Sequence, residues 1–145
     1  MTLKIGSFIG FALAVLGILF MLKKDYILSK DPVTIMIQVC SVALMIWARL
    51  TFGVRSFHAT ANTTQGALVT TGPYRWLRHP IYASIIYFIW ASLISHPFTD
   101  AFAAVILISG GLLLRMVLEE KSLILTYKNY PEYSKRTKRV IPFIF

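Results

Sequence analysis

Two clusters of polar side chains interrupt an otherwise apolar chain, and both contain residue types that can do chemistry. Paired carboxylates amid positive charge suit a cationic ligand, or a base whose pKa the protein tunes. The second cluster, which has such a pair, therefore indicates a binding or catalytic site. The first cluster is the run Gly72-Pro73-Tyr74-Arg75-Trp76-Leu77-Arg78-His79-Pro80-Ile81-Tyr82. The second cluster comprises Arg115, Glu119, Glu120, Tyr127, Tyr130, Tyr133 and Arg139.

Each cluster also has a purely structural interpretation. Arginines at the end of a membrane helix, such as Arg75 and Arg78, can extend to lipid phosphates. His79 can cap the helix that follows it, and the aromatic residues of the first cluster can form a belt at the membrane surface. Arg115 and Glu119 are four residues apart, which on a helix gives an ordinary surface ion pair.

The elements that must hold these clusters in place are membrane helices. Of 145 residues, 57% are hydrophobic and 14% are charged, whereas soluble domains have about 45–50% apolar and about 25% charged residues. The apolar residues form uncharged blocks at 5–22, 33–48, 81–95 and 101–114. A membrane-spanning helix needs roughly 17–25 residues. The first block supplies that length by itself, and the others reach it with their neighbours.

We therefore predict an all-α fold, an integral membrane helical bundle of about four transmembrane helices. A cytosolic interfacial C-terminal helix is expected to continue the last span from Arg115 to Tyr130. A buried hairpin in a soluble protein is disfavoured, because too little polar sequence is present to cover such helices. Residues 1–145 are predicted to form a single domain, and the apolar residues 141–145 to fold back onto the membrane or the protein.

The basic residues indicate which side of the membrane each loop occupies. With four spans, twelve of the fifteen Lys and Arg residues lie at the N-terminus, in the middle loop that contains Arg55, and in the C-terminal tail. The other side has Lys23, Lys24 and Lys30. Because cytoplasmic loops carry the Lys and Arg excess, both termini are predicted to be cytosolic. Cys40 lies inside the second span, so no intrachain disulfide is expected.

The last two spans determine how the clusters meet. They are joined by the short segment at His96–Pro97 and are therefore antiparallel, so the start of one lies beside the end of the other. The two clusters are thus predicted to lie together, and ionisable residues at a membrane boundary are functional candidates.

Two local sequence signals concern the helices themselves. The Gly110–Gly111 pair predicts close helix packing, and Asp31–Pro32 is typical of a helix start.

The segment from Leu68 to Tyr82 resembles the signature of the isoprenylcysteine carboxyl methyltransferase family and of the related phospholipid methyltransferases. Those families carry Arg-His-Pro-x-Tyr, a short membrane hairpin and then Glu-Glu. Here Arg78-His79-Pro80-x-Tyr82 precedes Glu119–Glu120 at a similar distance. The tail Tyr130-x-x-Tyr133 with Lys138-Arg139-x-x-Pro142 is also similar, whereas Ser84 stands where the family often has glycine. The resemblance covers residues 49–145.

The resemblance implies a methyltransferase that uses S-adenosylmethionine. It implies that Arg78 and Arg139 hold the carboxylate of the acceptor or the cofactor. Glu120 is the implied proton acceptor if the methyl acceptor is an amine. The implied acceptor is a lipidic or amphipathic molecule, such as a prenylated small molecule or peptide, met at the cytosolic membrane face. The implied cofactor-binding residues are Tyr74, His79, Tyr82, Glu119, Tyr130 and Tyr133.

Three other functions stay open at this point. They are a phospholipid N-methyltransferase, a nicotinamide-dependent membrane reductase, and a non-enzymatic membrane scaffold whose basic tail binds anionic lipid. The net charge is +9. The basic residues are concentrated on one predicted side of the membrane, which explains this charge, so no nucleic-acid partner is expected. His58 and His96 are isolated from other ligand-type residues, so no metal site is expected.

Overall fold

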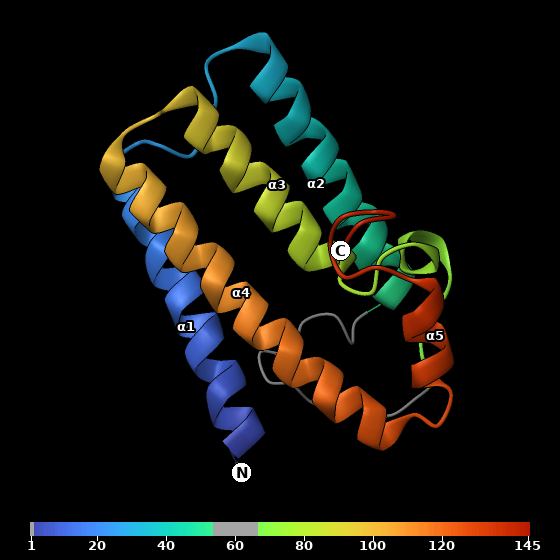
Figure 1. Ribbon diagram of the computed structural model, residues 1–145. Coiled ribbons are helices and arrows are strands. Elements are labelled where there is room, and N and C mark those ends of the chain that lie inside the picture. Colours follow the sequence, from blue (N-terminus) through green and yellow to red (C-terminus); the bar gives the residue numbers. More distant parts are fainter. Residues whose placement is uncertain (1, 54–66) are drawn as a thin grey trace.

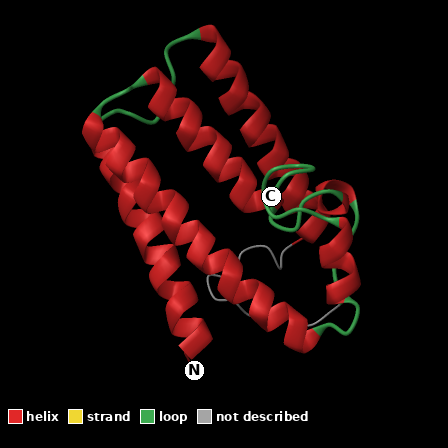
Figure 2. Cartoon of the chain, viewed as in Figure 1, coloured by secondary structure: helices red, strands yellow, loops and turns green. Residues whose placement is uncertain are grey.

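The computed structural model describes residues 2–53 and 67–145, and the regular structure in these residues is helical (Figure 2). This confirms the all-α prediction for the described part of the chain. Arg55 and His58 lie outside the described residues. The elements are α1 (Thr2–Lys23), α2 (Pro32–Phe52), a 3-10 turn η2 (Gly72–Arg75), α3 (Pro80–Ser95), α4 (Thr99–Thr126) and α5 (Tyr130–Arg136).

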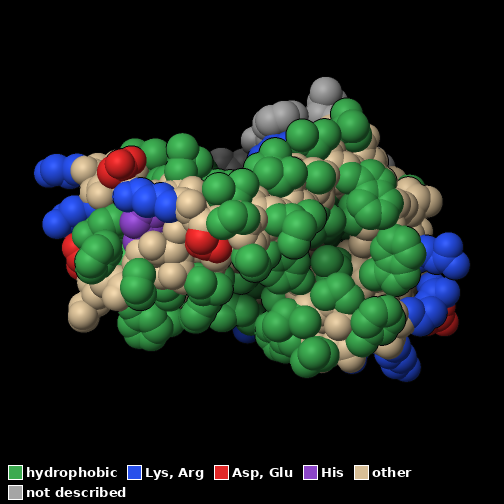
Figure 3. Space-filling view, turned by 90° about the horizontal axis from the view of Figure 1, so that it is seen from above, with side chains coloured by type: hydrophobic (Ala, Val, Ile, Leu, Met, Phe, Trp, Pro, Cys, Tyr) green, Lys and Arg blue, Asp and Glu red, His purple; other side chains and the backbone are tan. Residues whose placement is uncertain are grey.

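Three of the described helices have the length and composition of membrane spans. Helices α1, α2 and α4 are long and apolar enough to cross a bilayer, and α3 is an apolar helix of 16 residues. Figure 3 shows hydrophobic side chains over the middle of the molecule, with charged side chains gathered at its two ends. Many large apolar residues of α1 and α2 are exposed on this surface. The protein is therefore an integral membrane protein.

The helices form two antiparallel pairs. Helix α1 packs along α4, and α2 packs along α3 (Figure 1). Helices α3 and α4 are joined by a short turn at one end and diverge toward the other, where the N-terminus and α5 lie.

The start of α2 forms as the sequence predicts, because Asp31 Oδ1 accepts a hydrogen bond from Thr34 N at 3.0 Å and proline occupies the first turn.

The α1–α4 pair is held by close backbone approach. A Cβ atom added to Gly111 would lie 2.5 Å from the carbonyl oxygen of Gly10, and one added to Gly10 would lie 2.5 Å from the oxygen of Gly111. Small residues allow this approach, which gives membrane helices their van der Waals contact. The predicted close packing at Gly111 is confirmed, whereas a Cβ at Gly110 would meet nothing within 4 Å.

A buried amide ties the α1–α2 loop to the second pair. The Gln38 side chain of α2 donates hydrogen bonds to Ile27 O at 2.7 Å and to Ser92 Oγ at 2.9 Å. Its Oε1 accepts from Ser29 N at 3.1 Å. Burying an amide in an apolar bundle is costly unless it is hydrogen-bonded. This network satisfies Gln38 and fixes the loop against α3.

The C-terminal part differs from the predicted continuation over Arg115 to Tyr130. Helix α4 runs without a break to Thr126, so the prediction is right up to that residue and wrong beyond it. Tyr127 adopts extended backbone angles, and a separate helix begins at Tyr130 with a proline in its first turn. Proline favours the start of a helix because it lacks an N–H and has a helical φ.

Residues 138–140 of the C-terminal tail pack against the loop before α3 and against α3 itself. Arg78 N donates to Lys138 O at 2.6 Å, and Lys138 N donates to Trp76 O at 3.0 Å. Farther along, the Tyr87 hydroxyl of α3 donates to Val140 O. These contacts hold residues 138–140 against the protein. Residues 141–145 are exposed and bond locally, with Phe145 O accepting from Val140 N at 2.8 Å and from Ile141 N at 2.7 Å. The folding back of residues 141–145 onto the membrane or the protein stays a prediction.

Candidate active site

The loop before α3 is shaped by Gly72 and carries the first site residues. Gly72 has φ of 57°, in the left-handed region that favours glycine, and a Cβ there would lie 2.6 Å from Thr51 Oγ1 of α2. The glycine thus lets the loop turn directly against α2. The η2 turn and an extended stretch then lead to Arg78 and His79, immediately before the first residue of α3.

Arg78 joins three parts of the chain. Its Nε donates to Glu120 Oε1 at 2.8 Å, which links the loop to α4. Its Nη1 donates to Ser134 O at 2.7 Å and to Thr137 O at 2.6 Å, at the C-terminal end of α5. The Arg78 side chain is only 12% exposed. A planar guanidinium can serve these partners together, whereas an ammonium has no such fixed fork.

Glu120 lies between two arginines. Its Oε2 accepts from Arg139 at 3.1 Å (Nε) and 2.9 Å (Nη2), opposite the bond from Arg78. His79 Nε2 lies 3.4 Å from Glu120 Oε1, within ion-pair distance when the ring is protonated. Hydrogen bonding to Glu120 also raises the pKa of Arg139, so that side chain keeps its charge. Both oxygens of Glu120 are therefore engaged by cations of the protein itself.

Glu119 has a different set of partners. Its Oε1 accepts from the Tyr82 hydroxyl at 2.6 Å and from Arg115 Nε at 2.9 Å. Its Oε2 lies 3.9 Å from His79 Nδ1, beyond hydrogen-bond length. The His79 ring stacks on the Tyr82 ring with 5.6 Å between centroids. Among the described residues, hydrogen bonds therefore reach one oxygen of Glu119, and its side chain is 20% exposed.

Arg115 is not the surface residue that the spacing to Glu119 suggests. The ion pair forms, but Arg115 is only 4% exposed. Helix α4 continues beyond Leu114 without a break, so Arg115 lies on the side of α4 that packs against α1 and α3. Arg115 Nε also donates to the Tyr82 hydroxyl. The sequence interpretation missed this role, although an arginine next to an apolar block was a usable signal.

Three tyrosines line the C-terminal side of the cluster. The Tyr133 hydroxyl donates to Tyr74 O at 2.8 Å, and the Tyr130 and Tyr133 rings have centroids 5.9 Å apart. Burial raises the pKa of Tyr133 to about 12 and raises the pKa values of Tyr74 and Tyr130 above their usual range. All are thus neutral phenols near neutral pH. Among the described residues, the buried Tyr130 hydroxyl has no hydrogen-bond partner.

The structure brings the predicted site residues together. Hydrogen bonds join Arg78, Glu120 and Arg139 in one group and Tyr82 with Glu119 in another. His79 lies between the two groups, 3.4 Å from Glu120 Oε1 and 3.9 Å from Glu119 Oε2. The aromatic-belt alternative fits Trp76, which is 46% exposed, and does not fit the buried Tyr74. In the described part of the chain, no group of His, Cys, Asp and Glu side chains could hold a metal ion.

The chain matches a known family model. The family model described as isoprenylcysteine carboxyl methyltransferase (ICMT) family matches residues 33–125. This range contains the Arg-His-Pro run, Tyr82, Arg115 and both glutamates, whereas Tyr130, Tyr133 and Arg139 lie beyond it. Searches of curated proteins and of solved structures gave no match.

Proposed function

The chain belongs to the isoprenylcysteine carboxyl methyltransferase family, and on that premise we propose that it methylates the carboxylate of a lipidic acceptor at the cytosolic face. Membership of the family establishes the type of reaction and the methyl donor. The protein is a membrane methyltransferase that uses S-adenosylmethionine as methyl donor. The observation that carries the finer proposal is the different bonding of the two adjacent glutamates.

The residues of the site fit S-adenosylmethionine. This cofactor supplies an electrophilic methyl group on a sulfonium, and it also carries an ammonium and a carboxylate. Glu119 Oε2 lies 3.9 Å from His79 Nδ1, too far for a hydrogen bond to that ring. This oxygen can therefore accept a hydrogen bond from the ammonium of the cofactor. The buried Tyr130 hydroxyl lacks a partner within the described residues, which supports a ligand in reach of it. We assign Glu119 and Tyr130 to cofactor binding on these grounds.

Glu120 has a different role in this proposal. Both of its oxygens accept hydrogen bonds from arginines, at 2.8 Å from Arg78 and 2.9 Å from Arg139. A carboxylate held in this way is a poor proton acceptor. Glu120 instead orients the two guanidiniums, and Arg139, whose side chain is 33% exposed, can present N–H groups to an anion. The assignment of Glu120 as a base is therefore replaced by a positioning role.

This arrangement favours a carboxylate acceptor over an amine. A carboxylate is already the nucleophile and needs no base, and the nearby guanidiniums can orient it. An ammonium acceptor would first have to lose a proton and would meet the positive charge of Arg78 and Arg139. The proposed product is thus a methyl ester of an isoprenylcysteine-type molecule. We place the reaction at the cytosolic end, because the basic residues accumulate there.

Cofactor binding tests the proposal before the acceptor is known. Isothermal titration of the purified protein in detergent with S-adenosylmethionine is expected to show binding. Glu119→Gln should weaken it about tenfold or more, the value of a charge-assisted hydrogen bond. Glu132→Gln removes the same charge from an exposed position of α5 and should leave binding unchanged. Binding of a nicotinamide cofactor in place of S-adenosylmethionine would instead favour the reductase alternative.

A further inference from the structure

Arg115 is a buried cation, and in the described part of the chain three helices supply groups around its guanidinium. It lies in α4, in the stretch of that helix that qualifies as a membrane span. Its Nε donates to Glu119 Oε1 at 2.9 Å and to the Tyr82 hydroxyl of α3. A charged group so placed needs partners on every side, because the apolar surroundings solvate it poorly.

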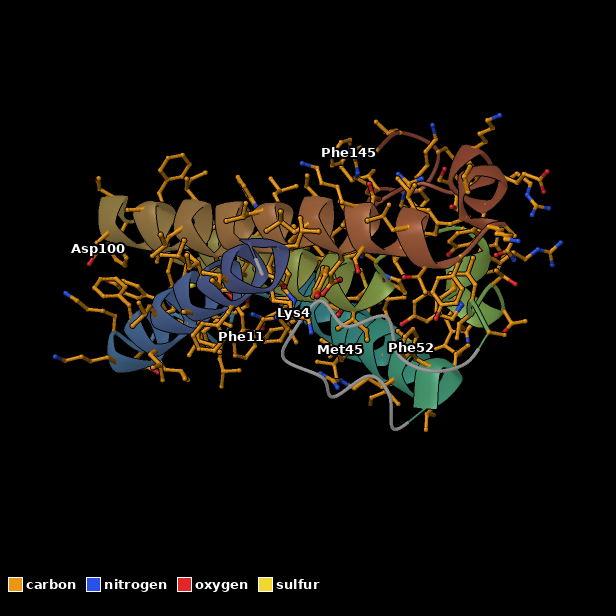
Figure 4. The ribbon with its side chains drawn as sticks, turned by 90° about the horizontal axis from the view of Figure 1, so that it is seen from below. Lys4, Phe11, Met45, Phe52, Asp100 and Phe145 are labelled. Carbon is orange, nitrogen blue, oxygen red and sulfur yellow. The ribbon has the colours of Figure 1, made fainter. Side chains whose placement is uncertain are left out.

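Among the described residues, α1 supplies a further partner of Arg115. The Arg115 guanidinium carbon lies 5.3 Å from the centroid of the Phe11 ring and 5.8 Å from that of the Tyr82 ring. Both distances are within the range of a cation–π interaction. Figure 4 shows Phe11 on α1, which runs beside α4. The cation is therefore flanked by an aromatic ring from α1 and one from α3.

We propose that Phe11 and Arg115 are positioning residues, which hold the Tyr82 hydroxyl and the Glu119 carboxylate in the orientation used for cofactor binding. This rests on the proposed function, since it assigns Glu119 to the cofactor. Helices α3 and α4 diverge toward this end of the bundle. Arg115 Nε bonds both the Tyr82 hydroxyl and Glu119 Oε1, and so supports the direct hydrogen bond between these two groups. Phe11 precedes the residues that match the family model, so the family match does not point to it.

Leucine and tyrosine at position 11 separate a π contact from simple packing. Phe11→Leu keeps an apolar side chain of similar size but removes the ring face. Phe11→Tyr keeps the ring. Phe8→Leu makes the same change at a residue of α1 that is 56% exposed, which makes it the matched control. If Phe11 only filled space between helices, leucine and tyrosine would act alike.

The test measures S-adenosylmethionine affinity and thermal stability of these variants in detergent. Phe11 is 39% exposed, so we expect Phe11→Leu to raise Kd by about threefold to fivefold, the value of a partly exposed cation–π contact. Phe11→Tyr and Phe8→Leu should stay within about twofold of the wild type. A Phe11→Leu protein that binds as tightly as the wild type would overturn the inference and leave the proposed function intact.

A double-mutant cycle with Arg115→Gln measures whether the effect of Phe11→Leu on Kd depends on the cation. A residue that only fills space would have the same effect with and without Arg115. Because Phe11 is proposed to act through the cation, Phe11→Leu should have little further effect on Kd once Arg115 is glutamine. Equal effects of Phe11→Leu in both backgrounds would contradict the inference. Absence of binding by the wild type itself would overturn the proposed function and this inference with it.

Discussion

The Nε atom of Arg78 donates a hydrogen bond to Oε1 of Glu120 over 2.8 Å, which joins the loop before α3 to the C-terminal part of α4. Both side chains are nearly buried, at 12% and 11% exposure. The remaining Nη1 bonds of Arg78 hold the end of α5. One guanidinium thus connects the elements that carry the candidate site, so its geometry as well as its charge should matter.

Arg78→Lys tests this geometry. Lysine keeps the charge but loses the planar fork that reaches Glu120, Ser134 O and Thr137 O together. We expect the free energy of unfolding to fall by about 1–3 kcal/mol and methyl transfer to fall with it. Thermal unfolding in detergent and an activity assay measure the two effects. Arg75→Lys, at an exposed position of the same loop, is the control and should behave as wild type. Equal stability of both variants would favour the scaffold alternative.

Tyr130→Phe separates binding from stability. The Tyr130 hydroxyl is buried and has no partner in the described residues, so its removal costs no internal hydrogen bond. We expect unchanged or slightly higher thermal stability, because a buried unsatisfied polar group is lost. S-adenosylmethionine affinity should fall by about threefold to tenfold, the value of one ordinary hydrogen bond. Unchanged affinity would show that the hydroxyl does not contact the cofactor.

The α1–α4 contact predicts opposite results at two adjacent glycines. Gly111→Ala places a Cβ 2.5 Å from the Gly10 carbonyl oxygen, whereas Gly110→Ala meets nothing within 4 Å. We expect Gly111→Ala to destabilise the protein by about 1–3 kcal/mol through overpacking, and Gly110→Ala to be neutral or better. Paired thermal unfolding curves decide the matter. The same stability for both variants would mean that the helices do not approach this closely.

High pH should loosen the C-terminal part. Burial raises the pKa of Tyr133 to about 12 in the folded protein, from about 10 in an unfolded chain. A raised pKa means that the folded state favours the neutral phenol. Its contribution to stability is fully present below pH ~10 and is lost as the pH rises toward 12. Tyrosinate absorbance followed against pH should show a late-titrating component, to which Tyr74 and Tyr130 also contribute and whose amplitude Tyr133→Phe lowers. An unchanged titration of this variant would contradict the assignment.

The sequence predicts the helices and the meeting of the two clusters because simple physical rules govern both. Apolar length determines the spans, and a short turn at His96–Pro97 forces the last two spans to be antiparallel. Arg78 and Glu120 are thereby brought to the same end, as the structure has them. The Asp31–Pro32 helix start depends on local capping chemistry, so it is also readable from sequence.

The partners of individual side chains could not be read in the same way. Burial of Arg115 depends on α1 packing along α4, and the spacing to Glu119 is the same for a surface pair and a buried one. The different roles of Glu119 and Glu120 follow from which tertiary neighbours each meets, although the two are adjacent in sequence. The start of α5 was readable from Pro131, since proline near a helix start is a local signal.

Methyl transfer by the purified protein in lipid nanodiscs tests the central claim most directly. The reaction would contain S-adenosylmethionine with a labelled methyl group, a farnesylcysteine derivative with a free carboxylate, and phosphatidylethanolamine. We predict label in a base-labile methyl ester of the farnesylcysteine derivative, with Glu119→Gln strongly reduced and Glu132→Gln unaffected. Label in the phospholipid amine, or in neither acceptor, would contradict the account.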